Sequence, residues 1–193
     1  MGTADRLEAL RQAALLDVDQ IDDDVLLAKN LDGLAEHLAR ERYLDVPRLH
    51  RALITPPRGA RKGDPGNPGR EHALVVKPAT RVELWLLVDG FSTLAALSEG
   101  GDLDLGEARL DAENQCLSFA YLAERPSAKI ANEYFQGCLD DAEARMESLG
   151  EQVTAYNRDL LPALREALAA ARSRAKQRQT FAAALEIPQP SRA

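Results

Sequence analysis

The chain has 193 residues, a formal net charge of -7, 45% hydrophobic residues and only 5% aromatic residues. A chain of this length can bury the core of one or two compact units, and its low aromatic content leaves that core to leucine, alanine and valine, which favours helix over sheet. The acidic balance argues against non-specific nucleic-acid binding, and a polar start without an apolar run of roughly 18 residues predicts a cytoplasmic protein that makes no membrane contact.

Three helices are predicted in the N-terminal part of the chain. The first has Thr3 placed to cap its start. An acidic stretch over 17–24 precedes the second helix, which is expected over about 25–43, and a third, short helical turn is expected near Pro47 because proline suits a first helical position. The apolar residues at helical spacing that should face inward are Leu7, Leu10, Ala14, Leu27, Leu31, Leu34 and Leu38.

The stretch 58–70 is rich in glycine, proline and basic residues. This composition cannot build a core, so we expect a mobile loop over 56–72. Its glycines resemble those of a phosphate-binding loop, but the Gly-Lys-Ser/Thr ending and the preceding strand are missing. A connector is therefore a better interpretation than a phosphate site.

The region that follows has the character of strands. Arg81–Val88 predicts a strand, Asp89-Gly90 predicts a tight turn, and 91–97 predicts the returning strand of a hairpin. Trp85 and three more of the chain's nine aromatic residues gather in this region, as expected for the packed face of a sheet. A small antiparallel sheet within about residues 80–122 is therefore expected, with further strands around 107–110 and 115–122.

One long helical pattern runs from Ser127 to Leu185, and at the standard helical rise it would extend roughly 88 Å. Pro162 lies inside the pattern, where proline removes a backbone hydrogen bond and clashes with the preceding turn. A single kinked helix and an antiparallel helical hairpin both fit, and the kinked helix is favoured because the apolar spacing continues through the proline without a slip. Charge is uneven, since 127–157 holds six acidic and two basic residues while 158–193 holds three acidic and seven basic residues.

The predicted fold class is therefore α+β, dominated by helix. A head over 1–126 would contain the N-terminal helices, the loop and the small sheet. A long helical region would follow over 127–188, before a short tail over 189–193. Helices of such length usually pack against a neighbouring domain, a partner or a second copy.

No catalytic, cofactor-binding or metal-ligating set can be named, so we expect a protein that is not an enzyme and needs no cofactor. His37, His50 and His72 lie on different predicted elements without ligand spacing. The two cysteines, Cys116 and Cys138, match neither a metal nor a redox spacing. The acidic stretch lacks the glycine and the glutamate that a calcium-binding loop requires.

The long helix carries the candidate interaction residues. Its apolar face has more surface than the head is expected to cover, so it should meet a second copy or a separately encoded protein. A basic run near its end would bind an acidic protein surface or phosphates, or would be a solvated helix face. The apolar face comprises Leu149, Val153, Tyr156, Leu160, Leu164 and Leu168, Asn157 beside Tyr156 is a further interaction candidate, and the basic run comprises Arg172, Arg174, Lys176 and Arg178.

One motif joins an aromatic-Asn-x-x-Leu pattern on the long helix to a basic pair and a Leu-x-Ile-Pro ending. Its residues are Tyr156, Asn157, Leu160, Arg172, Arg174 and Leu185–Pro188. This order resembles the end of an uncharacterised bacterial helical module, and the resemblance covers about residues 40–188, including an extended segment that ends at Gly90-Phe91. The chain departs from the module at two places, since the tail glycine is Glu186 here and a Pro-Ser pair is missing around 96–98.

Members of that family often precede a Toll/interleukin-receptor-like or a restriction-endonuclease-like effector domain, in proteins assigned to bacterial defence against phage. The resemblance therefore implies a non-catalytic assembly or regulatory module, which we expect to act with a separately encoded effector. The alternative is a nucleic-acid-associated accessory protein that uses the basic loop and the basic run together. Salt dependence separates the two, because phosphate binding weakens steeply with ionic strength and apolar packing does not.

Overall fold

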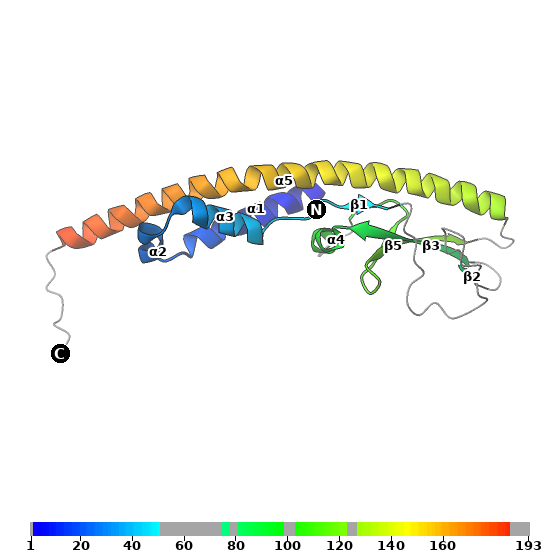
Figure 1. Ribbon diagram of the computed structural model, residues 1–193, viewed down its shortest axis with the longest axis horizontal. Helices are drawn as coiled ribbons and strands as arrows, with labels where there is room; N and C mark the ends of the chain where they lie inside the picture. The colour runs from blue at the N-terminus through cyan, green and yellow to red at the C-terminus, as the bar shows by residue number, and fades with distance from the viewer. Residues whose placement is uncertain (1, 51–74, 78–80, 99–102, 123–126, 186–193) are drawn as a thin grey trace. The chain divides into compact units, whose positions relative to one another are not determined.

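The computed structural model confirms the predicted fold class, a helix-dominated α+β protein with an antiparallel sheet and one long C-terminal helix (Figure 1). The predicted loop over 56–72 and the tail over 189–193 both lie wholly outside the residues that the structure describes. The described residues are 2–50, 75–77, 81–98, 103–122 and 127–185.

The chain forms two compact units, which are described separately. The sheet unit comprises Met1–Arg6 and Leu44–Thr154, and the helical unit comprises Leu7–Tyr43 and Ala155–Ala193. Each unit takes one part of the long helix. The long helix supplies core residues to both units.

The long helix α5 (Ala128–Ala184) is continuous over 57 residues and keeps Pro162 inside it. It begins where the sequence predicts, since the carbonyl of Ser127 accepts the N–H of Ala131 at 2.9 Å. The hairpin alternative is therefore wrong. The uninterrupted apolar spacing on both sides of the proline explains why the helix continues, because each turn still has a core to pack against.

The N-terminal helices are α1 (Thr3–Asp19), α2 (Asp23–Ala28) and α3 (Leu31–Glu41). The predicted second helix is thus two helices, because Lys29 adopts an extended conformation and the side chain of Asn30 accepts the N–H of Asp32 at 3.0 Å, which caps α3. Thr3 does not cap α1 as predicted, since it lies inside the helix and Gly2 precedes it.

The sheet contains β1 (Arg48–Leu49), β2 (Val75–Lys77), β3 (Arg81–Asp89), β4 (Arg109–Asp111) and β5 (Cys116–Leu122). All neighbours are antiparallel, in the order β1-β3-β5-β4, and β2 also pairs with β3. The strands predicted over 81–88 and around 107–110 and 115–122 are confirmed as β3, β4 and β5. The helical turn predicted near Pro47 is wrong, because the chain after it pairs as β1 with the end of β3.

The returning strand predicted over 91–97 is also wrong, because this segment is the helix α4 (Phe91–Ser98). Gly90 ends β3 with a positive φ of 68°, and its carbonyl accepts the N–H groups of Thr93 and Leu94. This geometry starts a helix instead of a hairpin. The buried residues Thr93, Leu94 and Leu97 have the spacing of one helical face.

The core of the sheet unit lies between one face of the sheet and the first part of α5. On that face Leu84 lies opposite Phe119 and Leu86 lies opposite Leu117, and all four side chains are buried. Tyr121 follows on the same face, with its ring centroid 5.3 Å from that of Tyr134 in α5. The apolar α5 side chains buried in this unit are those of Ala131, Phe135, Ala142, Met146, Leu149 and Val153.

Candidate functional site

The predicted apolar interaction face is buried within the chain. In the helical unit α1, α2 and α3 lie along α5 and share its core, to which they contribute Val18, Leu26 and Ala35 (Figure 1). The expectation that the rest of the chain leaves this face uncovered is therefore wrong, while a role for these residues with a partner stays a prediction. Their exposed fractions are 4% for Leu149, 0% for Val153, 7% for Tyr156, 1% for Leu160, and 0% for Leu164 and Leu168.

The aromatic-Asn motif also belongs to the interior of the helical unit. The hydroxyl of Tyr156 donates a hydrogen bond to the carbonyl of Arg42, with 3.3 Å between the oxygens. Burial raises the pKa of Tyr156, so the phenol stays protonated as the donor. Asn157 beside it is half-buried. The motif thus ties α5 to the end of α3.

Arg172, in the predicted basic run, binds main-chain carbonyls at the end of α2. Its Nε donates to the carbonyl of Leu26 at 2.5 Å, and the guanidinium also donates to the carbonyl of Lys29. The last carbonyls of a helix have no partner within the helix, and a guanidinium satisfies them while matching the negative end of the helix dipole. Arg172 therefore caps α2 from another helix.

The next arginines of the run bind the chain's own acidic stretch. Arg174 pairs with Asp19 at 2.6 Å, and Nε of Arg178 donates to Asp23 at 2.8 Å. The hydrogen bond from Arg178 holds the pKa of Asp23 below its ordinary value. Lys176 is exposed. Of the three roles predicted for the run, the described structure thus shows an acidic protein surface, supplied by the same chain.

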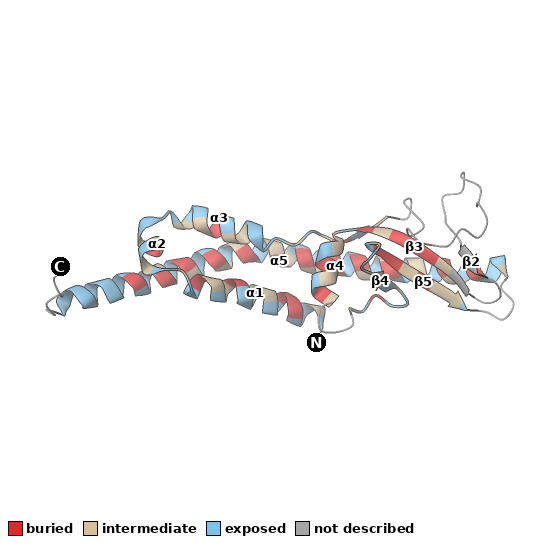
Figure 2. Ribbon diagram, turned by 90° about the horizontal axis from the view of Figure 1, so that it is seen from below, coloured by how far each residue is buried: buried red, intermediate tan, exposed pale blue. Residues whose placement is uncertain are grey.

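The last turns of α5 extend past this contact. Ala175 is the last buried residue of α5, and every described residue after it is exposed, as the uniformly pale end of the helix shows (Figure 2). Phe181 is 67% exposed and Leu185 is 45% exposed. The N–H of Leu185 still donates to the carbonyl of Phe181, so the two apolar side chains lie one turn apart on one face.

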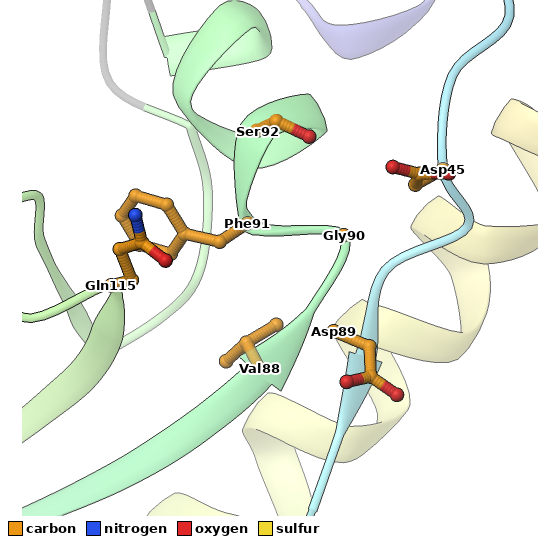
Figure 3. Close-up of a pocket in the computed structure, with 7 residues that line it drawn as sticks. All are labelled: Asp45, Val88, Asp89, Gly90, Phe91, Ser92 and Gln115. Atoms are coloured by element: carbon orange, nitrogen blue, oxygen red, sulfur yellow. The ribbon is translucent and has the colours of Figure 1, made fainter.

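A hollow of about 330 Å³ lies where β3 turns into α4 (Figure 3). Sequence reasoning missed it, because Asp89-Gly90 was interpreted as a hairpin turn. The helical spacing of Leu94 and Leu97 was the signal that would have placed a helix there. The residues that line it are Asp45, Val88, Asp89, Gly90, Phe91, Ser92 and Gln115.

The chemistry of this hollow is polar but offers no catalytic arrangement. Asp89 is engaged with Nε2 of His50 at 2.5 Å, and no hydrogen bond joins Ser92 to that histidine among the described residues. Gln115 has a positive φ of 53°, an uncommon conformation for a residue other than glycine. Among the described residues that line this hollow, no hydroxyl is therefore paired with a histidine that could serve as its base.

Both cysteines have poorly reactive thiols. Burial raises the pKa of Cys116 from its ordinary value of 9.0 to about 11, with a smaller contribution from the charge of Asp111. Burial likewise raises the pKa of Cys138. The thiolate is the reactive form, so neither site resembles a catalytic cysteine.

The Cys116 thiol should make stability sensitive to alkaline pH. Its pKa is raised in the folded chain, so its contribution is complete below the unfolded pKa of 9.0 and is lost as pH rises through about 11. We expect this loss to reach about 2 kcal/mol. Denaturant titrations from pH 8 to pH 11, with Cys116→Val as the variant that lacks the group, measure it. Equal pH slopes for the two chains would contradict the assignment.

The described residues contain no group of three or more histidine, cysteine or acidic side chains placed to hold a metal ion. Despite its length, α5 is too polar to cross a membrane, and the other described helices are no better suited. Comparisons with protein-family models, with curated proteins and with solved structures found no match for the chain.

Proposed function

We propose that the chain is a non-catalytic protein-interaction module, and that residues 179–185, the free end of α5, bind its partner. The observation that carries this proposal is the exposure of Phe181 and Leu185 on one face of a helical end that the other described residues do not cover. Among the described residues, none from 179 onward makes a hydrogen bond or an ion pair outside α5.

Exposure alone would be an ordinary finding. Leu16 is 61% exposed on α1, and single apolar residues are common on protein surfaces. The free end differs because it is a helical segment with no core of its own, and such segments are marginally stable in water. Docking of its apolar face would stabilise the helix and bury an aromatic side chain, which is a frequent anchor in protein interfaces.

The biological setting rests on the sequence resemblance alone. On the basis of this resemblance, we propose that the chain is a regulatory component of a bacterial defence system and acts with a separately encoded effector. A second copy of the chain is the other partner we consider. The nucleic-acid alternative has less support, because Arg172, Arg174 and Arg178 are bound within the chain.

Site-specific photo-crosslinking tests the proposal. A photoreactive phenylalanine analogue at Phe181 should give a discrete adduct with a protein in cells that contain the native partners. The same analogue at Leu16, a matched exposed position on α1, should give none. Leu185→Asp should remove the adduct from Phe181, because a charge would then lie on the docked face.

The mass of the adduct identifies the class of partner. A mass of twice the chain indicates a second copy, and any other discrete mass indicates a different protein. If Phe181 gives no adduct, or no more than Leu16 does, the free end is a solvated helix terminus and the proposal fails.

A further inference from the structure

The contact between the end of α1, α2 and the arginines of α5 has a matched register. Asp19 and Asp23 are four residues apart, as are Arg174 and Arg178, and each aspartate meets one arginine. Arg172 completes the contact at the other end of α2. We call Arg172, Arg174 and Arg178 the arginine row, and residues 19–29 the acidic strap.

The acidic strap is only weakly stabilised in its position. Helix α2 has only six residues, of which Leu26 alone is buried, and its N-cap residue Asp22 makes no side-chain capping bond. A helix this short has no independent stability. The ion pair between Arg174 and Asp19 is also open to water, with side chains 52% and 59% exposed, and exposed pairs contribute little and are screened by salt.

The arginine row runs directly into the element that we propose binds a partner. Arg178 immediately precedes the free end of α5, and Lys176 two residues before it is exposed. From Arg172 to Leu185 the helix contains four basic residues and no acidic residue. A partner that binds at Phe181 and also covers the preceding turns of α5 therefore contacts cationic side chains.

We propose that the arginine row is a binding surface for an acidic protein segment, and that the acidic strap occupies it as an intramolecular competitor. This inference rests on the proposed function, since it names the chemistry of the partner. The strap shows that chemistry: one carboxylate at the end of α1 and one at the start of α2, four residues apart, followed by the C-terminus of α2, whose carbonyls accept from Arg172. Release of the strap would expose the row next to Phe181 and Leu185.

The geometry favours a protein segment over nucleic acid. Arg172 binds two main-chain carbonyls, the acceptors that a helix C-terminus presents, so the group observed at this end of the row is protein backbone.

A competition experiment on the full chain tests the inference. The probe is a labelled peptide with the sequence of residues 17–30, and its binding is followed by fluorescence anisotropy at low salt. Asp19→Asn with Asp23→Asn should strengthen binding of this peptide at least about threefold over the wild-type chain, because the internal competitor loses both ion pairs. Adding Arg174→Ala and Arg178→Ala to that variant should remove the gain.

The strap itself supplies the matched control. Asp22→Asn with Asp24→Asn makes the same change of charge in the same segment, but these carboxylates do not meet the row, so binding should stay at the wild-type level. Circular dichroism should show unchanged helix in all variants, because every substituted side chain is half-buried or exposed. Hydrogen exchange should rise in α2 of the Asp19/Asp23 variant and stay unchanged in α5.

Three results overturn the inference. The first is no increase in peptide affinity in the Asp19/Asp23 variant, and the second is an equal increase in the Asp22/Asp24 control. The third is a larger increase in the affinity of the Asp19/Asp23 variant for a double-stranded DNA oligonucleotide than for the peptide. The last result would assign the row to phosphates. Crosslinking at Phe181 is measured on the wild-type chain with native partners. If Phe181 gives an adduct but the Asp19/Asp23 variant binds the peptide no more tightly, only the inference that the row binds an acidic segment is rejected. If Phe181 gives no adduct, the proposed function is rejected.

Discussion

Replacing Leu164 by alanine is expected to lower the free energy of unfolding by about 3–5 kcal/mol. Leu164 has no exposed surface and lies in the middle of the α5 face that α1, α2 and α3 share as their core. Truncation removes the transfer free energy of the side chain and leaves a cavity, because helices on a common core relax only in part. Chemical denaturation followed by circular dichroism measures the change.

Leu16→Ala is the matched control for this substitution. Leu16 is 61% exposed, so the same truncation should cost less than about 0.5 kcal/mol. A loss at Leu164 as small as that at Leu16, together with a change of oligomeric state, would mean that the face is an intermolecular seam after all. The pair of variants therefore separates a core from an interface.

The elements with a long, regular pattern could be predicted from the sequence. The spacing of Leu149, Val153, Leu160 and Leu164 keeps one helical face in phase across Pro162, and α5 is one helix for that reason. The strand β3 could be predicted as well, because a run of apolar and β-branched residues ends at Asp89-Gly90. Periodicity over many residues leaves few alternatives.

The segment after that turn shows where local reasoning fails. Asp-Gly is typical of a hairpin, but Gly90 at positive φ also ends a strand and allows a helix to begin at Phe91. The choice is decided by burial of Leu94 and Leu97, which a single sequence displays only as a weak pattern over eight residues. The hollow beside this turn was missed with it.

Whether the apolar face of α5 is buried within the chain depends on tertiary structure. The sequence shows that the stretch 17–24 is acidic and that the basic run of α5 is positively charged. It does not show whether these segments attract each other within one chain or between two copies, because both arrangements need the same opposite charges. The structure shows the first, through Arg174 with Asp19 and Arg178 with Asp23. Our proposal therefore places the interface at the free end of α5, where Phe181 and Leu185 are exposed.

Gly90→Ala is expected to lower the free energy of unfolding by about 3 kcal/mol. Gly90 has a φ of 68°, which costs a residue with a Cβ roughly 1–2 kcal/mol. A Cβ there would also lie 3.0 Å from the carbonyl oxygen of Asp45 and 3.1 Å from Cα of Pro47, both in the backbone, which cannot rotate away as a side chain would. The strain adds to the conformational cost, because β1 and the segment before it must shift.

The same substitution at Gly137 should have the opposite sign. Gly137 is exposed inside α5, and an added Cβ would meet nothing within 4 Å. Alanine there should raise the free energy of unfolding by about 0.5–1 kcal/mol, because glycine loses more backbone freedom than alanine when a helix forms. Denaturant titrations of the two variants beside the wild-type chain make the comparison. A neutral or stabilising Gly90→Ala would show that β3 does not turn tightly against the segment before β1, and that the start of α4 is wrongly placed.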